Sequence, residues 1–125
     1  MAESLHGQIK QIQAGLSFRA VQSLQKALEL PAGRLAELLG MSRATFQRRK
    51  VQGKLDRGES EKLARYQRLL ARAEEVFGDA KKGRQWLRTP RIGLADVAPL
   101  EFAASEIGAR EVENLLGRIE FGVYS

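Results

Sequence analysis

The sequence predicts an all-α protein with two helical units, residues 1–78 and residues 79–125. Three features support this prediction. Apolar residues recur at the i, i+3, i+4 and i+7 spacing of one helix face in several segments. Glycine, proline and small polar residues stand where such helices would begin and end. No segment shows the apolar–polar alternation of a strand, and there is no internal repeat or low-complexity tract.

The first half of the chain predicts four helices. Residues 5–16 have helical spacing, but two glycines weaken this first helix. Residues 18–30 follow a capping serine and carry apolar residues on one face. Residues 31–39 begin with proline at the first helical position and end at a glycine. Residues 43–51 follow the candidate cap Ser42 and end near a second glycine.

The second half predicts one long helix and three shorter ones. Residues 56–77 open with Asp-x-x-Glu, which resembles a capping box, and continue with an apolar stripe. Residues 80–87 follow a capping aspartate, and residues 88–99 form the longest irregular segment. Short and final helices are expected at 99–104 and at roughly 109–120.

Composition excludes several classes of protein. The hydrophobic content of 43% is ordinary for a globular protein, and no run approaches the roughly 18 apolar residues that span a bilayer. The N-terminus lacks the basic-then-apolar layout of a secretory signal. The chain has no cysteine, which excludes disulfides and thiolate metal sites. We expect a cytoplasmic protein without a membrane partner.

The charge is divided unevenly along the chain. Residues 1–91 carry 19 Lys and Arg against 9 Asp and Glu, whereas residues 92–125 carry 2 against 6. A basic region of this kind favours a polyanion partner. Because the acidic end does not, we expect two surfaces with two different partners.

Residues 31–51 have the layout of a helix-turn-helix motif, whose second helix can enter a DNA major groove roughly 12 Å wide. Arginine can pair with guanine, glutamine can pair with adenine, and hydroxyl groups can hold phosphate. The candidate DNA-binding residues are Ser42, Arg43, Thr45, Gln47, Arg48, Arg49 and Lys50. A basic stripe on the next helix is expected to track the phosphate backbone: Lys62, Arg65, Arg68 and Arg72. The alternative is an ordinary helix pair with solvated arginines.

A single helix-turn-helix contacts few base pairs, so a homodimer on paired half-sites is expected. The N-terminal segment or the long helix could supply the dimer interface.

No catalytic residue, metal site or cofactor site is predicted. The single histidine, His6, lies near the N-terminus with no acid or nucleophile fixed beside it in the sequence. The glycines are spread out as helix stops and do not form a phosphate-binding loop, and no metal-ligand spacing is present. We therefore expect a binding protein and not an enzyme.

Four segments carry a family resemblance: RATFQRRKVQGKL, ESEKLARYQRLLARAEEVFGD, WLRTP and GAREVENLLGRIEFGVYS. Together they resemble the Xre–MbcA–ParS group of bacterial antitoxins, over residues 15–125. The resemblance implies an Xre-like helix-turn-helix unit joined to a C-terminal toxin-binding unit. It also implies a partner toxin with a RES domain that consumes NAD, occlusion of that toxin's active site, and repression of the antitoxin's own promoter. The chain departs from similar proteins at Arg91, where asparagine is usual, at Ala95–Asp96, where a glycine pair is usual, and at Glu101.

The resemblance assigns toxin binding to the last helix and tail, through Arg118, Gly122, Val123, Tyr124 and Ser125. Alternatively, Phe121 and Val123 could fold back onto Leu100 and Phe102 of the same unit. Both could also hold, with Phe121 in the core and Tyr124 and Ser125 on the partner. The alternative function is a stand-alone dimeric helix-turn-helix repressor, whose C-terminal unit only dimerises. An antitoxin, unlike such a repressor, should form a stable complex with the product of an adjacent gene.

Overall fold

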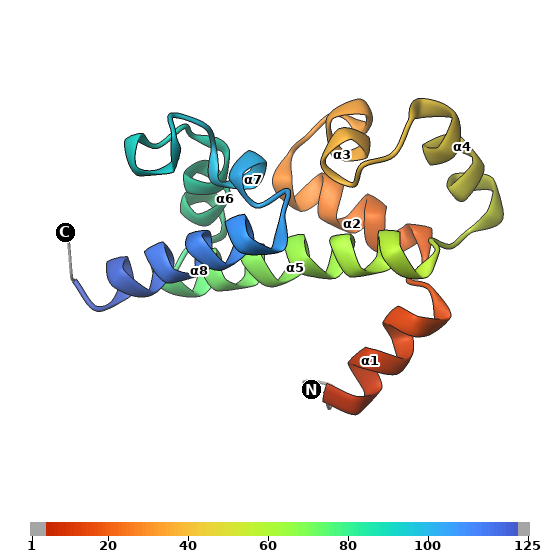
Figure 1. Ribbon diagram of the computed structural model, residues 1–125, viewed down its shortest axis with the longest axis horizontal. Coiled ribbons are helices and arrows are strands. Elements are labelled where there is room, and N and C mark those ends of the chain that lie inside the picture. The colour runs from red at the N-terminus through yellow and green to blue at the C-terminus, as the bar shows by residue number, and fades with distance from the viewer. Residues whose placement is uncertain (1–4, 123–125) are drawn as a thin grey trace. The chain divides into compact units, whose positions relative to one another are not determined.

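The computed structural model describes residues 5–122, and all regular secondary structure in that range is helical (Figure 1). The all-α prediction is therefore confirmed. The chain divides into two compact units between Ala64 and Arg65, within the long helix α5. The functional division that the sequence suggests, at residues 78 and 79, stays a prediction.

Unit 1 contains four helices and the first turns of a fifth: α1 (Leu5–Ala14), α2 (Phe18–Leu28), α3 (Ala32–Leu38), α4 (Arg43–Gln52) and α5 (Arg57–Phe77). Helices α2 and α3 bury the apolar faces that their spacing predicts. Helix α1 buries none of its residues, in keeping with the weak helix expected there. The core of unit 1 is therefore made by α2, α3 and the start of α5.

Local side-chain caps set the boundaries of these helices. Ser17 and Ser42 each accept a hydrogen bond from the backbone N–H three residues later, as an N-cap does. Asp56 and Glu59 form a reciprocal capping box at the start of α5, with hydrogen bonds of 2.7 and 2.9 Å. The predicted start of α3 is one residue early, because Pro31 has extended backbone angles and is the N-cap.

Unit 2 contains the rest of α5, then α6 (Ala80–Arg88), the 3-10 turn η1 (Ile92–Leu94), α7 (Pro99–Phe102) and α8 (Glu106–Glu120). The prediction for the last helix is wrong by three residues. Ser105 accepts a 3.0 Å hydrogen bond from the N–H of Gly108 and so caps a helix that begins at Glu106.

Two glycines allow the helices of unit 2 to approach closely. A methyl group on Gly108 would overlap the backbone carbonyl of Phe102 in α7, and one on Gly83 would lie 2.9 Å from the backbone of α5. The buried side chains of Val112 and Leu116 place α8 on the core of this unit. Glycine is thus required inside these helices for packing, not for a turn.

The segment between α6 and α7 is a compact loop closed by an isolated bridge between Arg91 and Val97. Ala95 and Asp96 have positive φ angles of 57° and 62°, a left-handed conformation that costs an L-residue about 1–2 kcal/mol. These are the two positions where similar proteins tend to have glycine. The loop therefore adopts left-handed angles without glycine, and next to it the Arg91 guanidinium lies 5.3 Å from the centroid of the Trp86 ring.

Candidate functional sites

The helix-turn-helix of unit 1 is formed by α3, a tight turn and α4 (Figure 1). Gly40 takes a positive φ of 70°, and the buried Met41 donates its N–H to the carbonyl of Ala36 at 2.8 Å. Phe46 packs edge-to-face on Phe18, with ring centroids 5.1 Å apart. No residue of α4 is fully buried, so most of its surface is open to a partner.

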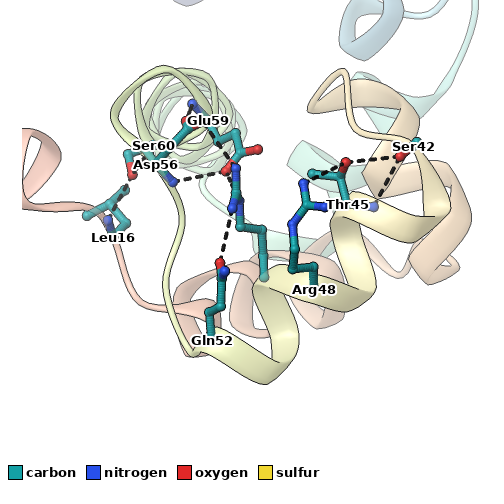
Figure 2. A network of polar contacts seen from close by, with 9 residues as sticks. Leu16, Ser42, Thr45, Arg48, Gln52, Asp56, Glu59 and Ser60 are labelled. Atoms are coloured by element: carbon teal, nitrogen blue, oxygen red, sulfur yellow. Dashed lines mark hydrogen bonds and ion pairs between the residues drawn. The ribbon is translucent and has the colours of Figure 1, made fainter.

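Five of the seven predicted DNA-binding residues are exposed: Ser42, Arg43, Gln47, Arg48 and Lys50. Four of these line one hollow of about 590 Å³ between α3 and α4, to which Arg48 does not contribute. The Ser42 hydroxyl donates to Thr45 Oγ1 at 3.0 Å and accepts from the Thr45 N–H (Figure 2). The structure therefore brings hydroxyl, amide and cationic groups together on one face, a combination that suits phosphates and base edges.

Arg49 differs from the other candidate residues. Its side chain is only 17% exposed, and its Nε donates to Glu59 Oε1 at 2.6 Å. Its two Nη atoms reach Gln52 and Asp56 at 3.0 and 3.3 Å, in the cluster of polar contacts around Glu59 (Figure 2). The hydrogen bond to Glu59 is the main cause that raises the pKa of Arg49. Its guanidinium is thus already engaged with carboxylates.

The expectation that the α5 basic residues track phosphate stays a prediction, and three arginines of this helix are paired within the protein. Each lies against a glutamate of α8, within unit 2. The pairs are Arg65–Glu106 at 3.1 Å, Arg68–Glu113 at 2.6 Å and Arg72–Glu120 at 2.7 Å. The glutamates recur every seven residues and so form one edge of α8. These arginines therefore hold α8 on α5.

The opposite side of α8 is a free face in unit 2. Its exposed residues recur at i, i+4, i+7, i+11 and i+14, which is one helix stripe. They are Ile107, Glu111, Asn114, Arg118 and Phe121. Ile107 and Phe121 are 77% and 79% exposed, and a hollow of about 420 Å³ lies over the C-terminal half of the stripe. We call these five residues the outer face of α8.

The outer face contains one predicted toxin-binding residue, Arg118. Gly122 is exposed just beyond it, with a positive φ of 69°. Val123, Tyr124 and Ser125 lie outside the described residues. The alternative in which Phe121 joins the core is wrong, because most of its surface is exposed. The sequence did not indicate Ile107 and Asn114 as members of an exposed face, although both lie opposite the buried stripe of this helix that it does predict.

Two further features were sought in the described part of the chain, a metal-ion site and a membrane-spanning helix. Within residues 5–122, no group of three or more His, Asp or Glu side chains could hold a metal ion. None of the helices in that range is both long and apolar enough to cross a membrane.

Comparison with known proteins matches two ranges of the chain to known domains. Residues 7–68 match the family described as "Antitoxin Xre-like helix-turn-helix domain", and residues 72–122 match "Antitoxin Xre/MbcA/ParS C-terminal toxin-binding domain". A protein of Yersinia enterocolitica named "Antitoxin Xre" is 34% identical over 119 residues, which cover 94% of this chain and 80% of that protein. One of the same name from Photorhabdus laumondii is 34% identical over 113 residues, 89% of this chain and 76% of that protein. A third, from Pseudomonas putida, is 34% identical over 64 residues, 51% of this chain and 40% of that protein.

Proposed function

Because this chain belongs to the Xre antitoxin family, with a helix-turn-helix domain followed by a toxin-binding domain, we propose that it neutralises a RES-type toxin by occlusion and represses its own operon. The family is one of antitoxins, not of enzymes. Its two domains imply a toxin partner and DNA. The identity of the toxin, the occlusion and the repression are the proposed steps.

The outer face of α8 is the observation that carries the toxin-binding half of the proposal. It lies inside the matched toxin-binding domain and presents two large apolar side chains, Ile107 and Phe121, about 21 Å apart at 1.5 Å per residue. Aromatic residues and arginine are enriched in protein interfaces, and this face carries Phe121 and Arg118. We propose that this face docks on the toxin while Gly122, Val123, Tyr124 and Ser125 enter its active-site cleft. The RES assignment rests on the sequence resemblance.

The exposed residues of α4 support the DNA-binding half. We propose that Ser42, Arg43, Thr45, Gln47, Arg48 and Lys50 contact operator DNA. Since one such helix reads few base pairs, the binding species is proposed to be a homodimer. Helix α1 is the proposed dimer interface, because Leu5 and Ile9 are 73% and 44% exposed and the helix buries none of its residues in its own unit. Such a protein acts where the chromosome lies, in the cytoplasm.

The test measures NAD loss caused by the product of the neighbouring gene. The toxin is assayed alone, with the full chain, and with a chain that ends at Glu120. Inhibition by the full chain but not by the shortened one supports a contact made after Glu120, by Phe121 or by the tail, whereas equal inhibition by both forms places the blocking contact on α8 itself. In a finer version, Tyr124→Ala should weaken inhibition without changing DNA binding. A neighbour that consumes no NAD, or is unaffected by the full chain, favours the stand-alone repressor instead.

A further inference from the structure

Few side chains of helix α4 pack against the rest of unit 1. None of its residues is fully buried, and Phe46 supplies its aromatic contact. Arg49 of α4 forms ion pairs with Asp56 and Glu59, and its side chain is only 17% exposed. It lies one turn after Phe46. Arg49 is therefore placed to fix the second half of the helix, where Phe46 no longer reaches.

The partner of Arg49 has a second task. Glu59 Oε1 accepts the Arg49 Nε–H at 2.6 Å and also the backbone N–H of Asp56 at 2.9 Å. The Glu59 side chain is only 13% exposed. One carboxylate thus closes the capping box of α5 and holds α4 at the same time. Any shift of α4 would break a charge-assisted hydrogen bond, which is stronger than a neutral one.

The backbone at the end of α4 is tied down as well. Gly53 accepts a 2.9 Å hydrogen bond from the N–H of Phe18, and Lys54 forms an isolated bridge with Ser17. Leu16 donates its N–H to the buried Ser60 hydroxyl at 2.8 Å (Figure 2). Since the start of α2, the end of α4 and the start of α5 meet here, the Arg49–Glu59 pair lies at a junction of three helices.

We propose that Arg49 is a positioning residue, which orients α4 for DNA through Glu59 and makes no phosphate or base contact of its own. The proposal rests on the proposed DNA binding. Its Nε and both Nη atoms each donate to an acceptor within unit 1. Two carboxylates offset its single charge, so it contributes little attraction to phosphate. Arg48, by contrast, is exposed and has one long contact, 3.5 Å to Thr45 Oγ1.

The two arginines therefore differ in how salt changes their effect. A lost phosphate contact makes the negative slope of log K against log [salt] shallower by about 0.9. A lost positioning contact lowers affinity at every salt concentration and leaves the slope unchanged. We expect Arg48→Ala to make the slope shallower by about 0.9. We expect Arg49→Ala to keep the wild-type slope and to weaken binding about tenfold, as loss of a charge-assisted hydrogen bond predicts.

The experiment measures binding to a DNA fragment from upstream of the chain's own gene, between 50 and 200 mM salt, a range in which phosphate contacts are well resolved. Four single variants and one double variant are compared with the wild type; the single ones are Arg48→Ala, Arg49→Ala, Arg49→Lys and Glu59→Gln. Glu59→Gln keeps a side-chain oxygen for the capping box and removes the charge. It should weaken binding as Arg49→Ala does, with an unchanged slope. The double variant Arg49→Ala/Glu59→Gln should be no weaker than either single one.

Several results would overturn the inference. If Arg49→Ala makes the salt slope as much shallower as Arg48→Ala does, Arg49 is a phosphate contact. Wild-type affinity in Glu59→Gln would show that the pair does not orient α4. If Arg49→Ala does not fold, Arg49→Lys and Glu59→Gln carry the same test, with lysine expected to restore part of the affinity. If the wild type itself shows no salt-dependent binding, the proposed DNA-binding function fails, an outcome distinct from failure of the positioning role alone.

Discussion

Truncating Phe121 to alanine tests whether the outer face of α8 binds toxin. An aromatic side chain buries about 150–250 Å², and Phe121 is 79% exposed, so about 160 Å² is available to a partner. At about 25 cal/mol per Å², full burial contributes at most about 4 kcal/mol. Interface hot spots lose about 2 kcal/mol or more on truncation, which weakens affinity about thirtyfold. Because the side chain is not in the core, the free energy of unfolding should change by less than about 0.5 kcal/mol.

The assay is toxin affinity measured by calorimetry, with the unfolding midpoint recorded for each variant. The matched control is Val51→Ala, since Val51 is 80% exposed but lies on α4 in unit 1. This control should bind toxin as the wild type does. If Phe121→Ala binds toxin with unchanged affinity, or if the control loses as much, the outer face of α8 is not the docking surface.

Three further predictions concern the stability of unit 2. Gly108→Ala should destabilise by about 2 kcal/mol or more, because the methyl group would overlap a carbonyl of α7; Gly117→Ala, with nothing within 4 Å, should be neutral or stabilise by about 0.5–1 kcal/mol. Thermal unfolding distinguishes the two. Ala95→Gly should raise the free energy of unfolding by about 0.5–1 kcal/mol by relieving left-handed strain, and a lower midpoint would contradict this. The hydrogen bond from Arg72 lowers the pKa of Glu120, so its stabilising effect is complete above the pKa of an unfolded glutamate and is lost as the pH falls through the lower folded value. The stability difference between wild type and Glu120→Gln should therefore vanish in acid.

Helix boundaries were predictable where the signal is local. Ser42 caps α4 through its own side chain, and Gly53 ends it in a left-handed conformation, so both limits can be read from the sequence. The start of α8 could not be read in this way, since Gly108 looks like a break before the helix. Packing against α7 requires that glycine inside the helix, and this requirement appears only in three dimensions.

The carboxylates that pair with the arginines could not be predicted from the sequence, for a related reason. On the sequence, Arg48 and Arg49 are equivalent members of one basic run. The two arginines differ because Arg49 pairs with Glu59, ten residues further along, where the sequence indicates only a cap of α5. Arg72 and Glu120 are 48 residues apart, and nothing local to either one indicates the pair. Charge patterning predicts how basic a segment is, but tertiary structure decides which of its charges are already paired.

The charge available to DNA is therefore smaller than the composition of the first 91 residues suggests. If its balance of +10 were all presented to phosphate, the salt slope would be about −9 per chain. Four of its arginines, at positions 49, 65, 68 and 72, are paired with carboxylates. The exposed cations of α4 are Arg43, Arg48 and Lys50. If only these contact phosphate, the slope is about −3 per chain, so a measured slope well steeper than −3 would show that further cations of the chain contact phosphate as well.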